Sequence, residues 1–234
     1  MLDAIRRLRR RIVLNRSLPR VVRSVRADGL TYLDAAALND LFQQVSEAEA
    51  EQREGILIEA GCALGGSAIV IAAAKSPLRP FYVYDAFGMI PPPSEHDGAD
   101  AHERYQAIRS GESEGIRGGR YYGYQENLLE KVAASFDKYA LPLEANNIHL
   151  VKGFFEDTLS VNEPVAFAHL DGDWYESVMT CLRRIEPHLV RGGVLVIDDY
   201  DDWSGCRKAA DEYFGDKRGE YEFVRRARLQ IIRR

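Results

Sequence analysis

The 234-residue chain contains few of the features that mark specialised protein classes. Its three cysteines, Cys62, Cys181 and Cys206, lie far apart, form no C-x-x-C pair and follow no secretion signal. This usage is typical of reduced thiols in a cytoplasmic protein and argues against a disulfide framework or a zinc site. No apolar run reaches the roughly 20 residues that a membrane-spanning helix needs.

Internal repeats and low-complexity tracts are also lacking, and the net charge of −5 argues against general nucleic-acid binding. The charge is uneven, because nine arginines lie between residues 6 and 26. Apolar residues recur there at helical spacing and predict a basic amphipathic helix that ends at Pro19. Such a helix packs on the domain or on a second subunit, or contacts an anionic substrate or a membrane surface.

Alternating strands and helices predict a single α/β domain over residues 1–234, with a helical N-terminal region over residues 1–54. Predicted strands cover residues 55–60, 81–84, 148–151, 165–170 and 193–197, and residues 221–224 and 228–232 form an antiparallel pair. Predicted helices cover residues 34–54, 68–74, 127–139, 175–189 and 204–214. The short apolar runs indicate buried, mostly parallel strands.

A glycine turn follows the first strand and indicates a nucleotide-type cradle. Its spacing is E-x-G-x-x-x-G, from Glu59 through Gly61 to Gly65, and not the G-x-G-x-x-G of dinucleotide sites. Glycines let the backbone approach a ligand, and the start of the next helix offers free N–H groups. Asp85 ends the second strand 20 positions after Gly65, where a carboxylate that binds ribose is expected.

Carboxylates follow two later strands, and the chain is organised around them. Asp171 and Asp173 come after residues 165–170, and Asp198 and Asp199 come after residues 193–197. Adjacent parallel strands would bring these four acids to one edge of the sheet, where open α/β sheets bind ligands. Clustered carboxylates repel one another, so either some stay protonated or a cation lies among them, and we favour the cation.

Residues 86–124 form a long polar insertion between a predicted strand and a helix. Three consecutive prolines, two histidines, many charges and Gly118-Gly119 give it little resemblance to a core segment. Loops of this length in a compact domain are usually functional or disordered, so we interpret this segment as a mobile lid. Tyr121, Tyr122 and Tyr124 at its end either line an acceptor site or anchor the lid.

The order of these motifs resembles the macrocin (TylF/MycF-type) O-methyltransferase family over about residues 28–232. The resemblance rests on five motifs: Glu59-Ala60-Gly61 with Gly65-Gly66, Asp85-Ala86-Phe87-Gly88, Gly153-Phe154-Phe155-Glu156-Asp157-Thr158-Leu159, Asp171-Gly172-Asp173-Trp174-Tyr175-Glu176-Ser177 and Asp198-Asp199-Tyr200. It implies a class I methyltransferase fold: a Rossmann-like, seven-stranded mixed sheet, mostly parallel, with an antiparallel C-terminal hairpin and helices on both faces.

The same resemblance implies S-adenosylmethionine as cofactor, Mg²⁺, and a sugar hydroxyl as acceptor, on a natural-product glycoside, a nucleotide sugar or a saccharide. It assigns Asp171, Asp198 and Asp199 as metal ligands. We take Asp171 and Asp173 as the catalytic candidates, with Asp173 as the base, as an acid that supports the metal ligands, or as a helix cap. The residues assigned to the cofactor are Thr31, Glu59, Gly61, Gly65, Ser67, Asp85, Phe155, Asp157 and Asp171. We also expect a cytoplasmic homo-oligomer, a dimer or larger.

Two departures from the family pattern leave the acceptor open. The turn Cys62-Ala63-Leu64 differs from the Val-Trp-Arg of macrolide enzymes, and the insertion is long. A metal-dependent catechol or phenol O-methyltransferase and a non-catalytic module that only binds the cofactor are the alternatives. His169 lies just before the acids and is expected to be a core or cofactor-adjacent histidine, not a catalytic one.

Overall fold

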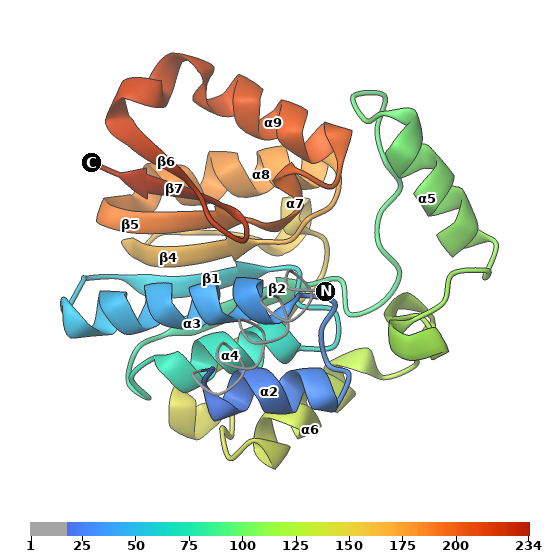
Figure 1. The fold of residues 1–234 in the computed structure, drawn as a ribbon, viewed down its shortest axis with the longest axis horizontal. Coiled ribbons are helices and arrows are strands. Elements are labelled where there is room, and N and C mark those ends of the chain that lie inside the picture. The colour runs from blue at the N-terminus through green and yellow to red at the C-terminus, as the bar shows by residue number, and fades with distance from the viewer. Residues whose placement is uncertain (1–17) are drawn as a thin grey trace, which may run out of the picture.

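The computed structural model describes residues 18–234 as one sheet with helices on both faces (Figure 1). Strands follow the order β3-β2-β1-β4-β5-β7-β6. Their bounds are β1 (Ile56–Ala60), β2 (Phe81–Asp85), β3 (Ile148–Lys152), β4 (Val165–Leu170), β5 (Leu189–Ile197), β6 (Tyr221–Arg225) and β7 (Leu229–Arg233). Strands β1 to β5 pair in parallel, and β7 runs antiparallel to β5 and β6. The predicted mixed sheet with its C-terminal hairpin is confirmed.

The α-helices of the described chain form two layers and one outlier. They are α2 (Arg20–Ala27), α3 (Ala35–Ala50), α4 (Gly66–Ala74), α5 (Ala99–Arg109), α6 (Leu128–Lys138), α7 (Phe155–Thr158), α8 (Tyr175–Ile185) and α9 (Ser204–Phe214). Helices α2, α3, α4 and α6 cover one face of the sheet, and α8 and α9, with the short α7 beside α8, cover the other (Figure 1). Helix α5 stands outside both layers, beyond one end of the strands.

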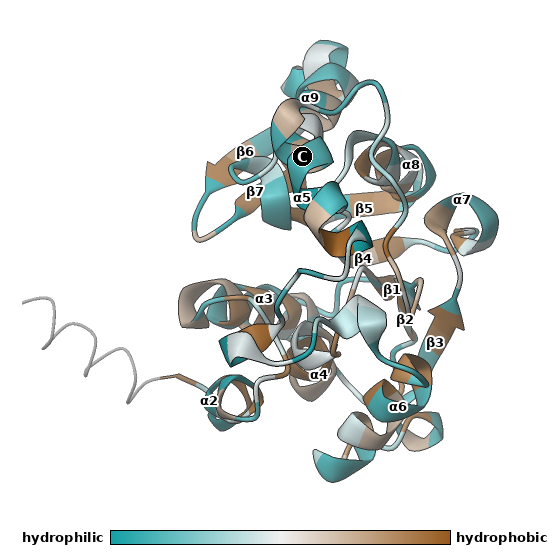
Figure 2. Cartoon of the chain, turned by 90° about the vertical axis from the view of Figure 1, so that its right-hand side faces the viewer, coloured by the Kyte–Doolittle hydropathy of each residue, from teal (hydrophilic) through white to brown (hydrophobic). Residues whose placement is uncertain are grey.

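Alternate residues of each central strand face opposite layers. Leu57 and Phe167 pack against the α3 and α4 side, while Ile58 and Ala168 pack against the α8 side. Both faces are covered, so these strands are apolar throughout, as their sequences predict. Figure 2 shows hydrophobic strands between helices that carry hydrophilic residues on their outer surfaces.

The sheet reverses its winding between β1 and β4, which places a crevice at their carboxyl ends. The chain moves outward from β1 through β2 to β3, then returns to pair β4 on the other side of β1. At such a switch point the connections that follow two adjacent strands lead to opposite faces of the sheet. Ligands of open α/β sheets bind in the crevice between these connections. The turn after β1 and the acids after β4 and β5 all lie at this crevice.

Several predicted boundaries differ from the observed ones. Helix α8 ends at Ile185 and not at residue 189, because Pro187 lacks the N–H that a continuing helix needs. Strand β5 begins four residues earlier than predicted, with a register shift against β4 that accommodates Gly192 and Gly193. Helix α3 ends at Ala50 and not at residue 54.

The polar insertion, residues 86–124, contains structure that its composition did not predict. It includes the 11-residue helix α5 and two short 3₁₀ helices, Ile116–Gly118 and Tyr122–Tyr124. Ala101 and Ile108 of α5 are buried, so the segment is not wholly polar surface. Its mobility stays a prediction.

Two further predictions concern the ends of the chain and the membrane. The basic helix predicted before Pro19 falls mostly on residues 1–17, outside the described residues, and α2 begins after that proline. Within residues 18–234, no helix is long and apolar enough to cross a membrane.

Gly61 should be the least replaceable residue of the turn after β1. Its φ is +93°, and an added Cβ would lie 1.9 Å from the Asp171 carbonyl oxygen, whereas Gly111 has a φ of +84° and open space around it. We expect Gly111→Ala to lower the free energy of unfolding by about 1–2 kcal/mol, the cost of a left-handed conformation. Gly61→Ala should cost more, because β1 and β4 must also separate. Equal losses for the two variants in urea unfolding would show that the contact between the strands is unimportant.

Candidate active site

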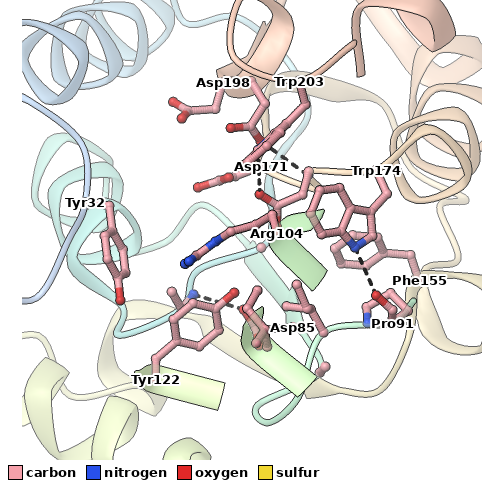
Figure 3. A pocket seen from close by; sticks show the side chains of 18 of the residues that line it. Tyr32, Asp85, Pro91, Arg104, Tyr122, Phe155, Asp171, Trp174, Asp198 and Trp203 are labelled. Atoms are coloured by element: carbon pink, nitrogen blue, oxygen red, sulfur yellow. Dashed lines mark hydrogen bonds between the residues drawn. The ribbon is translucent and has the colours of Figure 1, made fainter. Parts of the chain in front are cut away.

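A cavity of about 540 Å³ occupies the crevice at the carboxyl ends of β1, β2, β4 and β5 (Figure 3). Its floor comes from the ends of the strands, and its outer wall comes from residues 86–124 and from Tyr32 and Leu33 before α3. Residues from the N-terminal half and the C-terminal half of the sheet therefore meet in one site.

The Asp85 carboxylate fastens the glycine turn to the end of β2. Its Oδ2 accepts hydrogen bonds from the backbone N–H groups of Cys62 (2.8 Å) and Ala63 (3.0 Å), and its Oδ1 accepts one from Phe87 (2.6 Å). Burial raises the pKa of Asp85, and these amide hydrogen bonds only partly oppose that shift. Asp85 also lines the cavity, so one carboxylate both orders the turn and faces the ligand space.

Four of the residues that the sequence assigned to the cofactor line the cavity: Gly61, Asp85, Phe155 and Asp171. They come from the ends of β1 and β2, the short helix α7 and the end of β4. Phe155 contributes an aromatic ring on the side of the cavity away from Tyr32 (Figure 3). Together these four residues line the cavity from the glycine turn to the acids.

The other five do not line the cavity. Gly65 packs against Val132, and an added Cβ there would lie 2.8 Å from a Val132 methyl carbon. Thr31 Oγ1 accepts a hydrogen bond from Leu33 N–H at 3.1 Å. The remaining three are Ser67 and Glu59, which are buried, and Asp157, which is exposed on α7. Direct contact of these five residues with the cofactor stays a prediction.

Asp171, Asp173 and Asp199 form the acid cluster. Each offers one carboxylate oxygen, and these oxygens lie within 4.8 Å of one another. Asp173 adopts the left-handed region, with a φ of +55°, and its N–H donates to Asp199 Oδ2 at 3.3 Å. The Trp203 indole N–H donates to Asp173 Oδ1 at 3.1 Å, which orients that carboxylate.

Burial and mutual repulsion make full ionisation of this cluster costly. Burial, followed by the charges of neighbouring aspartates, raises the pKa values of Asp171 and Asp199 well above the usual range. The pKa of Asp173 rises to about 6, mainly through burial, although the Trp203 hydrogen bond opposes the shift. A bound cation would relieve the repulsion.

Asp198 is directed away from the cluster, toward positive charge. Its Oδ1 accepts from Arg228 Nε at 2.9 Å and lies 3.4 Å from His169 Nε2. His169 Nδ1 in turn lies 2.9 Å from Glu59 Oε1, and both of these side chains are fully buried. Although burial opposes its ionisation, His169 and Arg228 lower the pKa of Asp198. Asp198 lines the cavity but does not belong to the three-acid cluster.

His169 is buried in the core, as the sequence predicts, and Glu59 contacts it, while contact of Glu59 with the cofactor stays a prediction. Glu59 pairs in register with His169 across β1 and β4, so its side chain lies between the sheet and the helices and not beyond the strand end. The carboxylate therefore faces His169, and its second oxygen has no hydrogen-bond partner within the described chain.

The comparisons with known proteins identify the family. A family model described as Macrocin-O-methyltransferase (TylF) matches residues 21–222. This chain belongs to the macrocin O-methyltransferase family. It is therefore an S-adenosylmethionine-dependent O-methyltransferase with the class I fold, as the resemblance implied.

Individual relatives of this macrocin-family enzyme include two curated proteins. It is 32% identical over 191 residues to an 8-demethyl-8-(2,3-dimethoxy-alpha-L-rhamnosyl)-tetracenomycin-C 4'-O-methyltransferase of Streptomyces olivaceus, covering 79% of this chain and 67% of that protein. It is 27% identical over 194 residues to mycinamicin III 3''-O-methyltransferase of Micromonospora griseorubida, covering 78% and 69%.

Solved structures share the same architecture. The O-methyltransferase NovP superposes with a TM-score of 0.71 at 25% identity, covering 88% of this chain and 82% of that one. A Bacillus cereus O-methyltransferase in complex with SAH superposes with a TM-score of 0.57 at 11% identity, over 95% and 96% of the two chains. The second likeness shows the fold alone.

The macrocin-family enzyme also has cavity residues that the sequence did not reveal. Arg104 extends from α5 toward Tyr32 and Tyr122 (Figure 3), and its Cζ lies 5.7 Å from the centroid of the Tyr121 ring. Ile108, one turn later on the same helix, lines the cavity as well. Their spacing of four residues, which places both on one helix face, is the signal that would have indicated them.

The tyrosines that end the insertion of this enzyme divide between the two roles considered above. Tyr121 and Tyr122 line the cavity, with ring centroids 4.4 Å apart. The Tyr124 hydroxyl donates to the Ile108 carbonyl oxygen at 2.5 Å and so anchors the insertion to α5. Tyr121 and Tyr122 therefore line the cavity, whereas the neighbouring Tyr124 anchors the insertion.

The buried His169 should tie the stability of the enzyme to pH. Despite its burial, hydrogen bonds with Asp198 and Glu59 raise its pKa from 6.5 to about 9. The stabilisation is complete below pH 6.5 and is lost as the pH rises through 9, because the folded state then releases its extra proton. Relative to His169→Gln, we expect the free energy of unfolding to fall by up to about 3 kcal/mol over this range. If the difference in free energy of unfolding between the wild type and His169→Gln, measured in urea, does not vary with pH, the raised pKa of His169 would be contradicted.

Proposed function

We propose that this enzyme methylates a hydroxyl group of a sugar-containing small molecule, with Mg²⁺ bound at the acid cluster. The observation that carries the proposal is the closeness of three mutually repelling carboxylates, one buried and two half-buried, in the cavity that Asp85 also lines. The relatives support the acceptor class, since they include a rhamnosyl-tetracenomycin-C 4'-O-methyltransferase and mycinamicin III 3''-O-methyltransferase.

The residues present fit a hard divalent cation. Asp171 and Asp199 offer only oxygen ligands, and burial followed by the charges of neighbouring aspartates raises their pKa values. Asp198, the third ligand that the resemblance implied, lies beside them with one oxygen already bound to Arg228. When bound, Mg²⁺ would lower the pKa of a hydroxyl that contacts it.

Two residues suit the cofactor. Asp85 stands at the end of β2, where its carboxylate would accept hydrogen bonds from ribose hydroxyls. Phe155 offers an aromatic face to the adenine ring. When bound, S-adenosylmethionine would supply the methyl group on a positively charged sulfur, so alignment with the acceptor would account for much of the rate.

Asp173 is suited to accept the proton of the acceptor hydroxyl. Its pKa of about 6 leaves it mostly ionised at neutral pH, and Trp203 holds one of its oxygens in place. The rings of Trp174 and Trp203, with centroids 5.4 Å apart, offer an apolar wall beside it. These rings and residues 86–124 would exclude water from the reacting atoms.

Metal dependence can be tested with a matched pair of variants. We expect EDTA to abolish turnover and Mg²⁺ to restore it, and Asp199→Asn to lower activity at least about a hundredfold. Asp202→Asn is the control, because Asp202 lines the same cavity but lies outside the cluster. Mg²⁺ should also raise the melting temperature of the wild type but not of Asp199→Asn. Full activity in metal-free buffer would rule the cation out.

Cofactor binding can be tested separately from turnover. Asp85→Ala should weaken S-adenosylmethionine binding about ten- to hundredfold in calorimetric titration, through loss of charge-assisted hydrogen bonds. Glu156→Ala should change it much less, because Glu156 is exposed on α7 and does not line the cavity. An unchanged dissociation constant for Asp85→Ala would refute its assignment.

Turnover assays with a rhamnoside, with catechol and without acceptor would distinguish the proposed activity from a phenol methyltransferase and from a non-catalytic binding module. A cytoplasmic location and assembly into a homo-oligomer stay predictions.

A further inference from the structure

Residues 86–124 contact the acid-bearing half of the molecule at the start of two helices. Asp97 Oδ1 accepts from the N–H of Tyr175, the first residue of α8, at 2.8 Å. Asp100 Oδ2 accepts from the N–H of Ser204, the first residue of α9, at 2.9 Å, and Asp100 Oδ1 accepts from the Ser204 hydroxyl at 2.7 Å. Each helix follows a strand end that carries two of the acids.

Neither helix supplies a cap of its own. Trp174 precedes α8 and Trp203 precedes α9, and neither provides a side-chain cap. The first N–H groups of a helix need acceptors, which an aspartate, asparagine, serine or threonine at the preceding position usually provides. Here a tryptophan ring stands in that position and lines the cavity, while the oxygen acceptor comes from a segment far away in sequence.

The junction is closely packed. An added Cβ on Gly205 would lie 1.9 Å from Asp97 Oδ1, and one on Gly98 would lie 2.4 Å from the Ser204 hydroxyl oxygen. Asp97 is buried, and its other oxygen accepts from the N–H (2.8 Å) and the hydroxyl (3.0 Å) of Ser94. The Trp174 indole N–H adds a hydrogen bond to the Pro91 carbonyl oxygen at 2.9 Å (Figure 3).

We propose that Asp97 and Asp100 are positioning residues: by capping α8 and α9 from the insertion, they fix Trp174 and Trp203 in the acceptor wall. The acceptor role of this wall rests on the function proposed above. Movement at the start of α9 would shift Trp203 and thereby the hydrogen bond that orients Asp173. The same two contacts hold α5 so that Arg104 faces the cavity. When residues 86–124 dock on the starts of α8 and α9, the acceptor site is therefore assembled at the same time.

The test uses Asp97→Ala, Asp100→Ala and the double variant. Glu103→Ala is the matched control, because Glu103 is exposed on α5 and forms no hydrogen bond with the described residues of α8 or α9. The chain has two tryptophans in all, and both lie at this junction, so intrinsic fluorescence reports on it directly. Without metal, cofactor or acceptor, emission of the double variant should shift to longer wavelength and become more accessible to acrylamide. Glu103→Ala should match the wild type.

Two further measurements separate positioning from general stability. Affinity for S-adenosylmethionine should stay within about twofold of wild type, because Asp85 and the glycine turn lie away from the junction. Asp100→Asn should restore the wild-type emission, because asparagine caps helices about as well as aspartate. A folded double variant with unchanged emission and quenching would overturn the proposal, and so would a parallel loss of cofactor binding.

Hydrogen exchange in the wild type keeps the proposal testable if the double variant does not fold. The Tyr175 and Ser204 amides should exchange at the rate of the amides of α5, because all of them open when the insertion undocks. Exchange at the slower rate of the α8 and α9 interiors would refute the proposal. Since the fluorescence and exchange measurements need no substrate, they stand apart from the question of which acceptor is methylated.

Discussion

The structure of the enzyme depends on how the negative charges at the carboxyl ends of two neighbouring strands are compensated. Four acids follow β4 and β5 directly: Asp171, Asp173, Asp198 and Asp199. Burial makes their mutual electrostatic repulsion energetically costly. Arg228 and the buried His169 compensate Asp198 and lower its pKa. Burial and the neighbouring charges keep the pKa values of Asp171 and Asp199 raised, and the Trp203 hydrogen bond and the charge of Arg104 only partly offset the rise at Asp173.

The sequence predicted this part of the molecule well, because it depends on local patterns. Apolar runs of five or six residues indicate buried strands, and acids that follow them must lie at the carboxyl edge of a parallel sheet. The positions of Asp85 and Asp171 follow from that rule alone. Gly61 was equally predictable, since a turn that passes within contact distance of the next strand tolerates no side chain.

Other features depend on tertiary contacts that leave no local pattern. Glu59 occupies the position expected of a cofactor ligand, but its register opposite His169 directs it into the layer beneath the site. Helix α5 has no apolar stripe strong enough to predict it, and hydrogen bonds of Asp97, Asp100 and Tyr124 hold its two ends. Arg104 lines the cavity from this helix. The composition therefore showed that the insertion is polar but did not show where it packs.

The anchors of residues 86–124 are unevenly distributed along the segment. Its first part is bound to α8 and α9 through Asp97 and Asp100, and its last part joins the cavity through Tyr121 and Tyr122. Between them, the Arg117 guanidinium donates to the carbonyl oxygens of Arg26 and Ala27, whereas Gly111 meets open space. Lengthening a loop between two fixed points costs little conformational entropy. Evolution can thus insert residues near Gly111 while the carboxylates beneath keep their geometry.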